Sequence, residues 1–140
     1  MKLSLLTYAT SLLAFLSISS LQLTAQVRLN MNLDSATIMI GDHLGLTIDI
    51  AAPPGIRIQN IAYGNWADEG KVELLEIGEL NTVAETPQLL LQQRLLLTTF
   101  DTGYLRLPPL LLVYEKDGIL DTVLSSNLGL QVNSLEVQAE

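Results

Sequence analysis

Apolar and polar residues alternate along several short stretches of this chain. The segment 27–33 alternates Val, Leu and Met with Arg and Asn, and the segment 44–50 alternates Leu and Ile with Gly, Thr and Asp. A period of two places successive side chains on opposite faces of a strand. The segment 128–132 near the C-terminus has the same pattern. Each of these segments is predicted to be a strand with one face in a core and one in water.

Turn-forming residues separate further apolar stretches. Gly41-Asp42 precedes the 44–50 strand, Pro53-Pro54-Gly55 ends it, and Glu115-Lys116-Asp117-Gly118 is typical of a hairpin turn. Pro108-Pro109 interrupts the apolar run from Leu105 to Tyr114. Because proline cannot donate to a ladder, this pair indicates an edge, a bulge or a switch between sheets. The remaining strands are expected at 38–40, 56–62, 71–77, 105–114 and 119–124.

The segment from Gln88 to Phe100 fits two structures. Thr86-Pro87 is a suitable start for a helix, and the many leucines that follow suit a buried one. The β-branched Thr98 and Thr99 favour a strand instead. We interpret the segment as a strand, because a single helix among strands would have no helical partner.

The number and spacing of these segments predict the fold class. About seven to nine short strands separated by turns are typical of an immunoglobulin-like β-sandwich. We therefore expect an all-β protein with one such domain at residues 26–140.

Residues 1–25 are predicted to be a secretory signal peptide. Met1-Lys2 precedes an apolar and hydroxylic run, and small residues at Thr24-Ala25 suit cleavage after Ala25. An uncleaved membrane anchor is the alternative, since about 20 apolar residues can span a bilayer. Both alternatives place the rest of the chain outside the cytoplasm, and we expect it in the periplasm, either free or associated with the inner membrane.

Charge and cysteine content narrow the classes of function. The chain has a net charge of −8, and its few Lys and Arg residues are scattered singly, which disfavours nucleic acid and anionic membranes as ligands. It contains no cysteine, so neither a disulfide nor a thiolate metal site can form.

The sequence offers little support for catalysis. His43 is the only histidine, and it follows a predicted turn, which is the usual place of a solvated residue. Asp117 and Asp121 lack the dense oxygen ligands of a calcium loop. Carboxylate pairs cannot be assigned from sequence alone, because any two acidic residues can meet in space. We predict no catalytic residue, cofactor or metal, and a small hydrolase remains a rival hypothesis.

Protein binding is the function that remains. A sandwich can bind through the loops at its ends or through strand edges. The loop 63–70 combines aromatic and acidic residues, and Tyr63, Trp66, Asp68 and Glu69 are its candidate binding residues. Trp66 also suits a core position, because its large apolar surface is usually buried. A carbohydrate- or surface-binding sandwich is the alternative, but such modules normally expose several aromatics.

The segment Leu97–Pro109 reads Leu-Thr-Thr-Phe-Asp-Thr-Gly-Tyr-Leu-Arg-Leu-Pro-Pro. It resembles the "LT-x-FD-x-G-x-Y-x-I-PP" segment of the BatD-like oxygen-tolerance (aerotolerance) proteins. The segment 33–42, with its Ile-Gly-Asp turn, is also similar to the start of that family's domain.

Asp101, Gly103 and Tyr104 form a predicted structural corner. Tyr104 follows Gly103 one residue sooner than in the common tyrosine corner. The sequence therefore does not decide whether Tyr104 makes the hydrogen bond that is usual in such corners.

The resemblance, which covers roughly residues 27–137, implies the biological context. It implies a periplasmic immunoglobulin-like domain of an inner-membrane protein. Such proteins are encoded with von Willebrand A-domain proteins, tetratricopeptide-repeat proteins and a MoxR-type ATPase, and are thought to assemble with some of them. We therefore expect a non-catalytic interaction domain of an aerotolerance or envelope stress assembly, with von Willebrand A-domain and tetratricopeptide-repeat membrane proteins as suspected partners. No catalytic residues carry over from the family.

Overall fold

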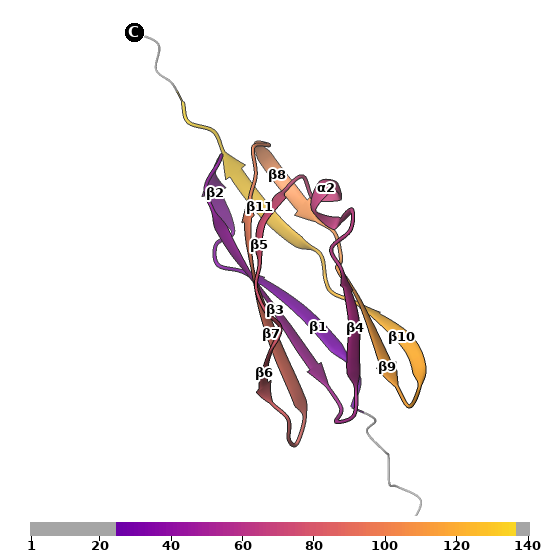
Figure 1. Ribbon diagram of the computed structural model, residues 1–140. Coiled ribbons are helices and arrows are strands. Elements are labelled where there is room, and N and C mark those ends of the chain that lie inside the picture. The colour runs from indigo at the N-terminus through magenta and orange to yellow at the C-terminus, as the bar shows by residue number, and fades with distance from the viewer. Residues whose placement is uncertain (1–24, 137–140) are drawn as a thin grey trace, which may run out of the picture.

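The structure is a computed structural model that describes residues 25–136. The predicted signal peptide lies outside these residues except for Ala25, so it stays a prediction. The described part of the chain consists of strands and one short helix (Figure 1). In chain order these are β1 (Arg28–Leu33), β2 (Thr37–Met39), β3 (Leu44–Ala52), β4 (Arg57–Ala62), α2 (Trp66–Glu69), β5 (Glu73–Ile77), β6 (Asn81–Ala84), β7 (Leu89–Thr98), β8 (Gly103–Leu107), β9 (Leu111–Lys116), β10 (Ile119–Leu124) and β11 (Leu128–Asn133).

One layer of the sandwich is the sheet β1-β3-β7-β5, in which all neighbours are antiparallel. Strand β6 pairs with another part of β7, so β5 and β6 together occupy the position of one fourth strand. The sequence pattern does not indicate β6. Its Val83 is exposed and its other residues are polar or small, so it lacks a buried apolar face to reveal it.

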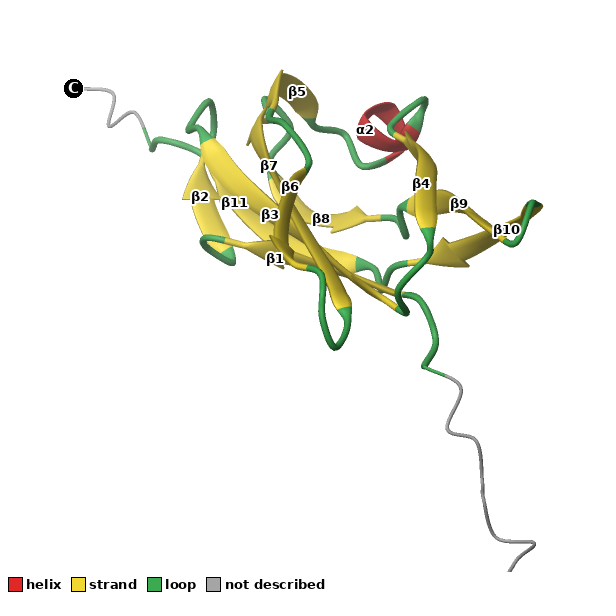
Figure 2. Cartoon of the chain, turned by 60° about the horizontal axis from the view of Figure 1, so that its bottom comes forward, coloured by secondary structure: helices red, strands yellow, loops and turns green. Residues whose placement is uncertain are grey.

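The other layer is a long hairpin with an interruption. Strands β9 and β10 pair in one sheet with β4, and β8 and β11 pair in another with β2 (Figure 2). The register is the same on both sides of the interruption, since Leu111 lies opposite Leu124 and Leu107 lies opposite Leu128. Pro108-Pro109 lies at the break, and the strands on its two sides belong to different hydrogen-bonded sheets. Of the three predicted alternatives, this is the switch between sheets.

Ser125 maintains the alignment of the two hairpin arms across this break. Its backbone N–H donates to the carbonyl of Leu110 at 3.0 Å, and its hydroxyl accepts the N–H of Leu110 at 2.8 Å. A side-chain oxygen thus takes a place that a backbone carbonyl would take in a regular ladder. The hairpin passes the two prolines without a change of register.

The strand order is that of the immunoglobulin fold. Strands β1, β3, β7 and β5 correspond to its A-B-E-D sheet, and β4, β9 and β10 to its C-F-G sheet. Strand β2 adds to β11 in the parallel direction. The predicted all-β, immunoglobulin-like sandwich is confirmed, and the described residues contain more strands than predicted because of β6 and the break in the long hairpin.

The core lies between the two layers and is built from inward-facing aliphatic residues. Burial alternates along β1 and β3 as the sequence pattern predicted. The side chains that are almost completely buried are Leu46, Ile48, Ile50, Leu95, Leu97, Leu107, Leu110, Leu112, Leu130, Val132 and Thr99. The exclusion of this apolar surface from water is the main favourable contribution to folding.

The segment 88–100 forms a strand, as interpreted from the sequence. Strand β7 pairs with β3 over its length and buries Leu91, Leu95 and Leu97 on its inner face. Leu90 and Arg94 point the other way. A helix with the same sequence would spread its leucines around the axis, and the sheet would lose its central strand.

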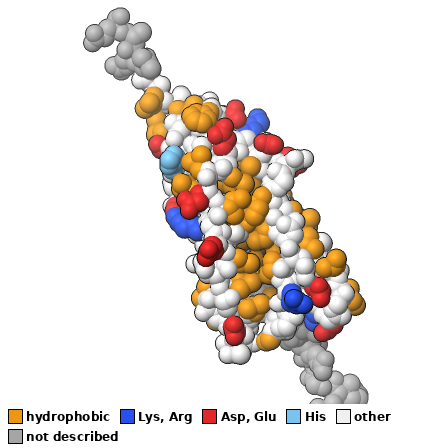
Figure 3. Space-filling model, viewed as in Figure 1, with side chains coloured by type: hydrophobic (Ala, Val, Ile, Leu, Met, Phe, Trp, Pro, Cys, Tyr) orange, Lys and Arg blue, Asp and Glu red, His pale blue; other side chains and the backbone are white. Residues whose placement is uncertain are grey.

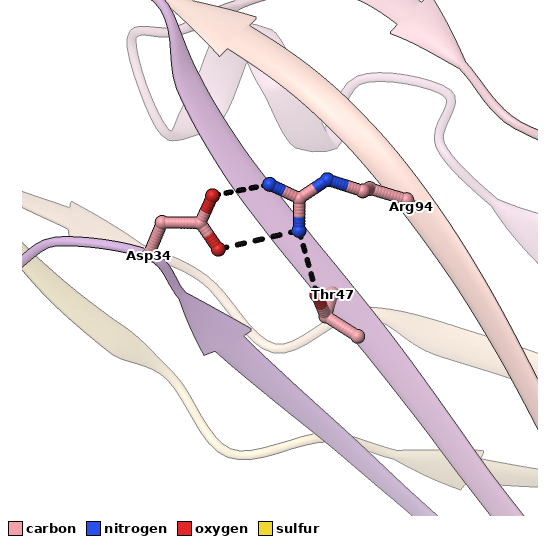
Figure 4. A network of polar contacts seen from close by, with 3 residues as sticks. All are labelled: Asp34, Thr47 and Arg94. Carbon is pink, nitrogen blue, oxygen red and sulfur yellow. Dashed lines mark hydrogen bonds and ion pairs between the residues drawn. The ribbon is translucent and has the colours of Figure 1, made fainter.

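A polar network ties the outer face of the first layer together (Figure 4). The guanidinium of Arg94 on β7 contacts both carboxylate oxygens of Asp34 and also donates to Thr47 on β3 at 3.2 Å. Gly45 makes room for this contact, because a Cβ at that position would overlap the Arg94 guanidinium and the Asp34 carboxylate. The ion pair therefore lies flat across β3 and joins the end of β1 to β7.

Substitutions in β7 test the assignment of its two faces. Leu95 is 1% exposed and Leu90 is 37% exposed on the same strand. Leu95→Ala should lower the free energy of unfolding by about 2–5 kcal/mol, because it leaves a cavity in the core. Leu90→Ala should cost less than about 1 kcal/mol. Urea unfolding of the two variants measures the difference, and equal losses would contradict the assignment.

Candidate interaction surface

The loop 63–70, the first candidate for partner binding, contains the helix α2 and is anchored to the core. Trp66 is only 5% exposed, and its indole N–H donates to the carbonyl of Pro108 at 2.7 Å. Of the two roles expected for Trp66, the structure shows the core position, and its buried ring leaves little surface for a binding anchor. A tryptophan in this position satisfies a carbonyl that Pro108 exposes where the ladder is broken.

Close packing explains why this loop lies against the break. Gly70 follows α2, and a Cβ at this position would come within 2.7 Å of the Leu107 side chain and 3.3 Å of the Trp66 carbonyl. The loop backbone therefore approaches β8 as closely as a glycine allows. Loop 63–70 therefore packs against the interrupted hairpin and stabilises it at the break.

Tyr63 belongs to a polar contact inside the sandwich. Its half-buried hydroxyl donates to the side-chain oxygen of Gln93, and the Gln93 amide donates to the carbonyl of Gly78 at 2.7 Å. Gln93 is a buried polar residue on the inner face of β7. Burial raises the pKa of Tyr63 to about 12, with the hydrogen bond to Gln93 opposing the shift. Tyr63 therefore links the two layers, and this role in packing was missed from the sequence.

Asp68 and Glu69 are exposed on α2. Because Trp66 is buried and Tyr63 points to Gln93, the four predicted residues do not form one exposed cluster. A binding role for Asp68 and Glu69 stays a prediction.

The predicted corner at Asp101 and Gly103 is a turn between β7 and β8, but Tyr104 does not lock it. Gly103 has a φ of 101°, which only glycine adopts readily. The buried residue of the corner is Thr99, whose hydroxyl donates to the carbonyl of Lys71 at 2.7 Å and accepts the N–H of Asp101 at 3.1 Å. The backbone carbonyl of Thr99 accepts the N–H of Gly41 at 2.9 Å.

Tyr104 is 69% exposed and lies outside the core. The alternation along β8 explains this, because Leu105 and Leu107 face inward and Tyr104 and Arg106 face outward. The Tyr104 ring lies over Gly129 on the neighbouring strand, where a Cβ would overlap the phenol. The tyrosine-corner role is thus ruled out by the register of β8.

The described residues contain no group of three or more His, Asp or Glu side chains that could hold a metal ion. His43 is exposed in the connection between β2 and β3. In the same part of the chain, 25–136, no helix has the length and hydropathy needed to cross a membrane.

The most unusual surface of the domain is the outer face of the sheet β4-β9-β10. Strand β9 begins with Leu111-Leu112-Val113, and Leu112 alone of these faces the core. Cross-strand pairing places Leu124 next to Leu111, and Thr122 next to Val113. Leu120 and Leu124 are 64% and 60% exposed. We call Leu111, Val113, Leu120 and Leu124 the outer patch.

This patch departs from the usual pattern of an antiparallel sandwich, in which the outer face is polar. A run of apolar residues without alternation is typical of a strand that is covered on both faces. Figure 3 shows hydrophobic side chains along the margin where Figure 1 places β9 and β10. In the described chain Leu120 and Leu124 of the outer patch are exposed, and Leu111 and Val113 are half-buried.

A cleft lies on the other side of the same hairpin. It has a volume of about 550 Å³ and is lined by Val27, Pro53, Tyr114, Ile119 and Asp121, among others. Tyr114 donates to the Asp121 carboxylate at 3.2 Å inside it. The tip of the β9–β10 hairpin thus exposes apolar surface on both faces.

The fold and this surface define the class of the protein as an immunoglobulin-like β-sandwich domain with a partly exposed apolar sheet face. No model of a known protein family matches the chain, and no curated protein matches it. The resemblance to BatD-like proteins therefore stays a hypothesis that rests on the residues quoted above.

Comparison of two aromatic residues tests which of them belongs to the core. Trp66→Ala should lower the free energy of unfolding by about 3–5 kcal/mol, because it removes a buried ring and leaves the Pro108 carbonyl without its donor. Tyr104→Ala should cost no more than about 1 kcal/mol. Thermal and urea unfolding measure both. A larger loss for Tyr104→Ala would contradict the register of β8.

The pH dependence of stability tests the position of Tyr63. Between pH 10 and about pH 12 the unfolded chain loses the Tyr63 proton while the folded chain retains it, so the free energy of unfolding should fall as the pH rises. Tyr63→Phe should remove that part of the slope. At neutral pH the same variant should cost about 1–3 kcal/mol, because Gln93 loses its donor. Urea unfolding over this pH range provides the measurement, and an unchanged slope would place Tyr63 in water.

Proposed function

We propose that this chain is an exported, non-catalytic interaction domain that binds another protein through the outer face of the sheet β4-β9-β10. The observation that carries the proposal is the apolar outer patch on β9 and β10. Two of its leucines are more than half exposed in the described chain. Exposed apolar patches with polar surroundings are typical of protein interfaces.

The energetics of the patch support this proposal. Covering a fully exposed leucine contributes about 1.5–3 kcal/mol, and Leu120 and Leu124 are each close to two-thirds exposed. Covering both supplies a contribution of the size that hot-spot residues make in protein interfaces. Glu115 lies opposite Leu120 at the margin of the patch, where its carboxylate accepts a hydrogen bond from Gln59 at 2.9 Å. The rest of the patch has no charged side chain, so burial of Leu111, Val113 and Leu124 carries little cost of ion desolvation.

We further propose that the partners are envelope proteins, and that the domain works within a BatD-like aerotolerance or envelope stress assembly in the periplasm. This context rests on the resemblance of Leu97–Pro109 and of the segment 33–42 to that family. Von Willebrand A-domain and tetratricopeptide-repeat membrane proteins are the suspected partners. The scattered cations and net charge of −8 favour a protein partner over nucleic acid.

A carbohydrate- or surface-binding module is the second candidate. The specific observation in its favour is that Phe100 and Tyr104 are 66% and 69% exposed near one end of the sandwich. Exposed aromatic rings can stack on sugar rings. Binding to a glycan array that is lost in Tyr104→Ala and kept in Val113→Lys would favour this candidate.

Affinity capture from solubilised bacterial envelope tests the proposed function. The full chain with a C-terminal affinity tag serves as bait, with mass spectrometry as the readout. Val113→Lys places a charge in the middle of the outer patch and leaves the inner face of β9 unchanged. We expect the wild-type chain to recover defined envelope proteins and Val113→Lys to recover at least ten-fold less of them.

Val83→Lys is the control for the added charge, and unfolding of both variants in urea shows whether they stay folded, because Val113 is half-buried and Val83 is exposed. Val83 is 63% exposed on β6, in the other layer of the sandwich. The control variant should recover the same proteins as the wild type. Equal recovery by Val113→Lys would contradict the assignment to the outer patch, and recovery of no protein by the wild type would contradict the interaction function.

A further inference from the structure

Within residues 25–136, β9 is the one strand that forms a ladder with β10, so the other edge of β10 is free of strand pairing, although β1 of the opposite layer lies near it. Strand β10 has six residues in unbroken register with β9, and three of its large aliphatic residues, Ile119, Leu120 and Leu124, are more than half exposed. A long regular edge strand with apolar side chains is a template for pairing with another strand.

The other free edges carry features that hinder such pairing. The pairings of β4, β5 and β6 contain register shifts, β2 has only three residues, β8 ends at Pro108-Pro109, and the exposed side chains of β1 are Arg28, Asn30 and Asn32. Short length, bulges, charges and proline all disfavour pairing at an edge. Strand β10 has none of these except for one charge, Asp121.

The register of the hairpin decides which backbone groups of β10 are free. A two-residue turn at Asp117-Gly118 makes Lys116 and Ile119 a hydrogen-bonded pair, and such pairs recur at every second position. Ser125, which donates to the carbonyl of Leu110, continues the same series. The N–H and C=O groups of Leu120, Thr122 and Leu124 therefore point away from β9.

We propose that β10 pairs in antiparallel orientation with β10 of a second copy of this chain, about a two-fold axis at Thr122. In this register the free groups of Thr122 face those of the partner's Thr122, and the free groups of Leu120 face those of the partner's Leu124. Each such pair can exchange two N–H···O bonds. The surface is thus complementary to itself, which a two-fold interface requires.

Charge disfavours one neighbouring register, in which the axis lies at Asp121. Asp121 is the only charged residue of β10. With the axis at Thr122, Asp121 lies opposite Val123 of the partner subunit, whereas a shift of the axis to Asp121 would place two carboxylates opposite each other. Like charges at directly opposite positions destabilise a strand pair. The two chains are each acidic, but the paired segments contribute only one carboxylate apiece.

The same arrangement covers part of the apolar surface. Leu120 and Leu124 project from the outer face. Leu120 therefore packs beside Leu124 of the partner subunit, and Leu124 packs beside Leu120 of the partner subunit. The two sheets β4-β9-β10 become one continuous sheet across the axis, and the two outer patches join. The inference rests on the proposed function in one respect, since it uses the outer patch, but Val113 at its centre stays free for another protein.

Asp121 moderates the association. Its carboxylate accepts the N–H of Thr122 at 2.7 Å, and this is one of the groups that must bond to the second copy. The bond has to break when the strands pair. Removal of the carboxylate should therefore strengthen the dimer, which distinguishes edge pairing from a contact through side chains alone.

Sedimentation equilibrium of the purified chain over a concentration series tests this inference. We expect a monomer–dimer equilibrium with a Kd on the order of micromolar. Thr122→Pro removes the N–H donor at the axis and keeps the ladder to β9, so it should weaken association at least ten-fold. Leu124→Lys should do the same without a change in the backbone, and Asp121→Ala should tighten association several-fold. Val83→Lys, with a similarly exposed valine in the other layer, should leave it unchanged.

A chain that stays monomeric up to about 0.5 mM, or a dimer that Thr122→Pro and Leu124→Lys leave intact, would overturn the inference. Hydrogen exchange adds a check by residue, because the amides of Leu120 and Leu124 should become protected only in concentrated samples. Loss of envelope partners in Thr122→Pro with a monomeric wild-type chain would assign the edge to a different protein and likewise overturn the second-copy assignment. Failure of the proposed function appears separately, as a wild-type chain that dimerises but captures no envelope protein.

Discussion

The pairing of β3 with β7 is the constraint on which the rest of this domain depends. These strands are in register from Leu44 opposite Leu97 to Ala52 opposite Leu89, and both are central in their sheet. Their inward side chains supply much of the buried aliphatic surface. Because a slip of one residue would turn every leucine of β7 to the other face, this register also fixes where Gln93 meets Tyr63 and where Arg94 reaches Asp34.

In the second layer two prolines interrupt the main hairpin, so backbone groups at the break lack partners in a regular ladder. The unsatisfied backbone groups at the break obtain partners from side chains, namely the hydroxyl of Ser125 for the N–H of Leu110 and the indole of Trp66 for the carbonyl of Pro108. A buried backbone group without a partner would cost free energy comparable to a lost hydrogen bond. The loop 63–70 is thus part of the framework, although its composition resembles that of a binding loop.

The division of the hairpin also separates two kinds of surface. Beyond the break, β11 is covered along one side by β2, so its backbone groups have partners. Before the break, no second strand of residues 25–136 pairs with β10, and two of its three outward side chains, Leu120 and Leu124, are apolar. The uncovered edge and the outer patch therefore occur on the same half of the layer. This coincidence connects the proposed interaction function with the inferred association of two copies.

The sequence by itself determined the fold class and most of the strands, because alternation along β1, β3 and β11 records which side chains leave water, and turn residues record where strands end. It did not reveal β6, whose exposed residues carry no such alternation. It also did not determine whether Trp66 and Tyr104 are buried, since an aromatic side chain suits a core, a corner or a binding surface equally well. Only the tertiary structure decided these roles, because the register of β8 turned Tyr104 outward and the break at Pro108 gave Trp66 an acceptor inside the protein.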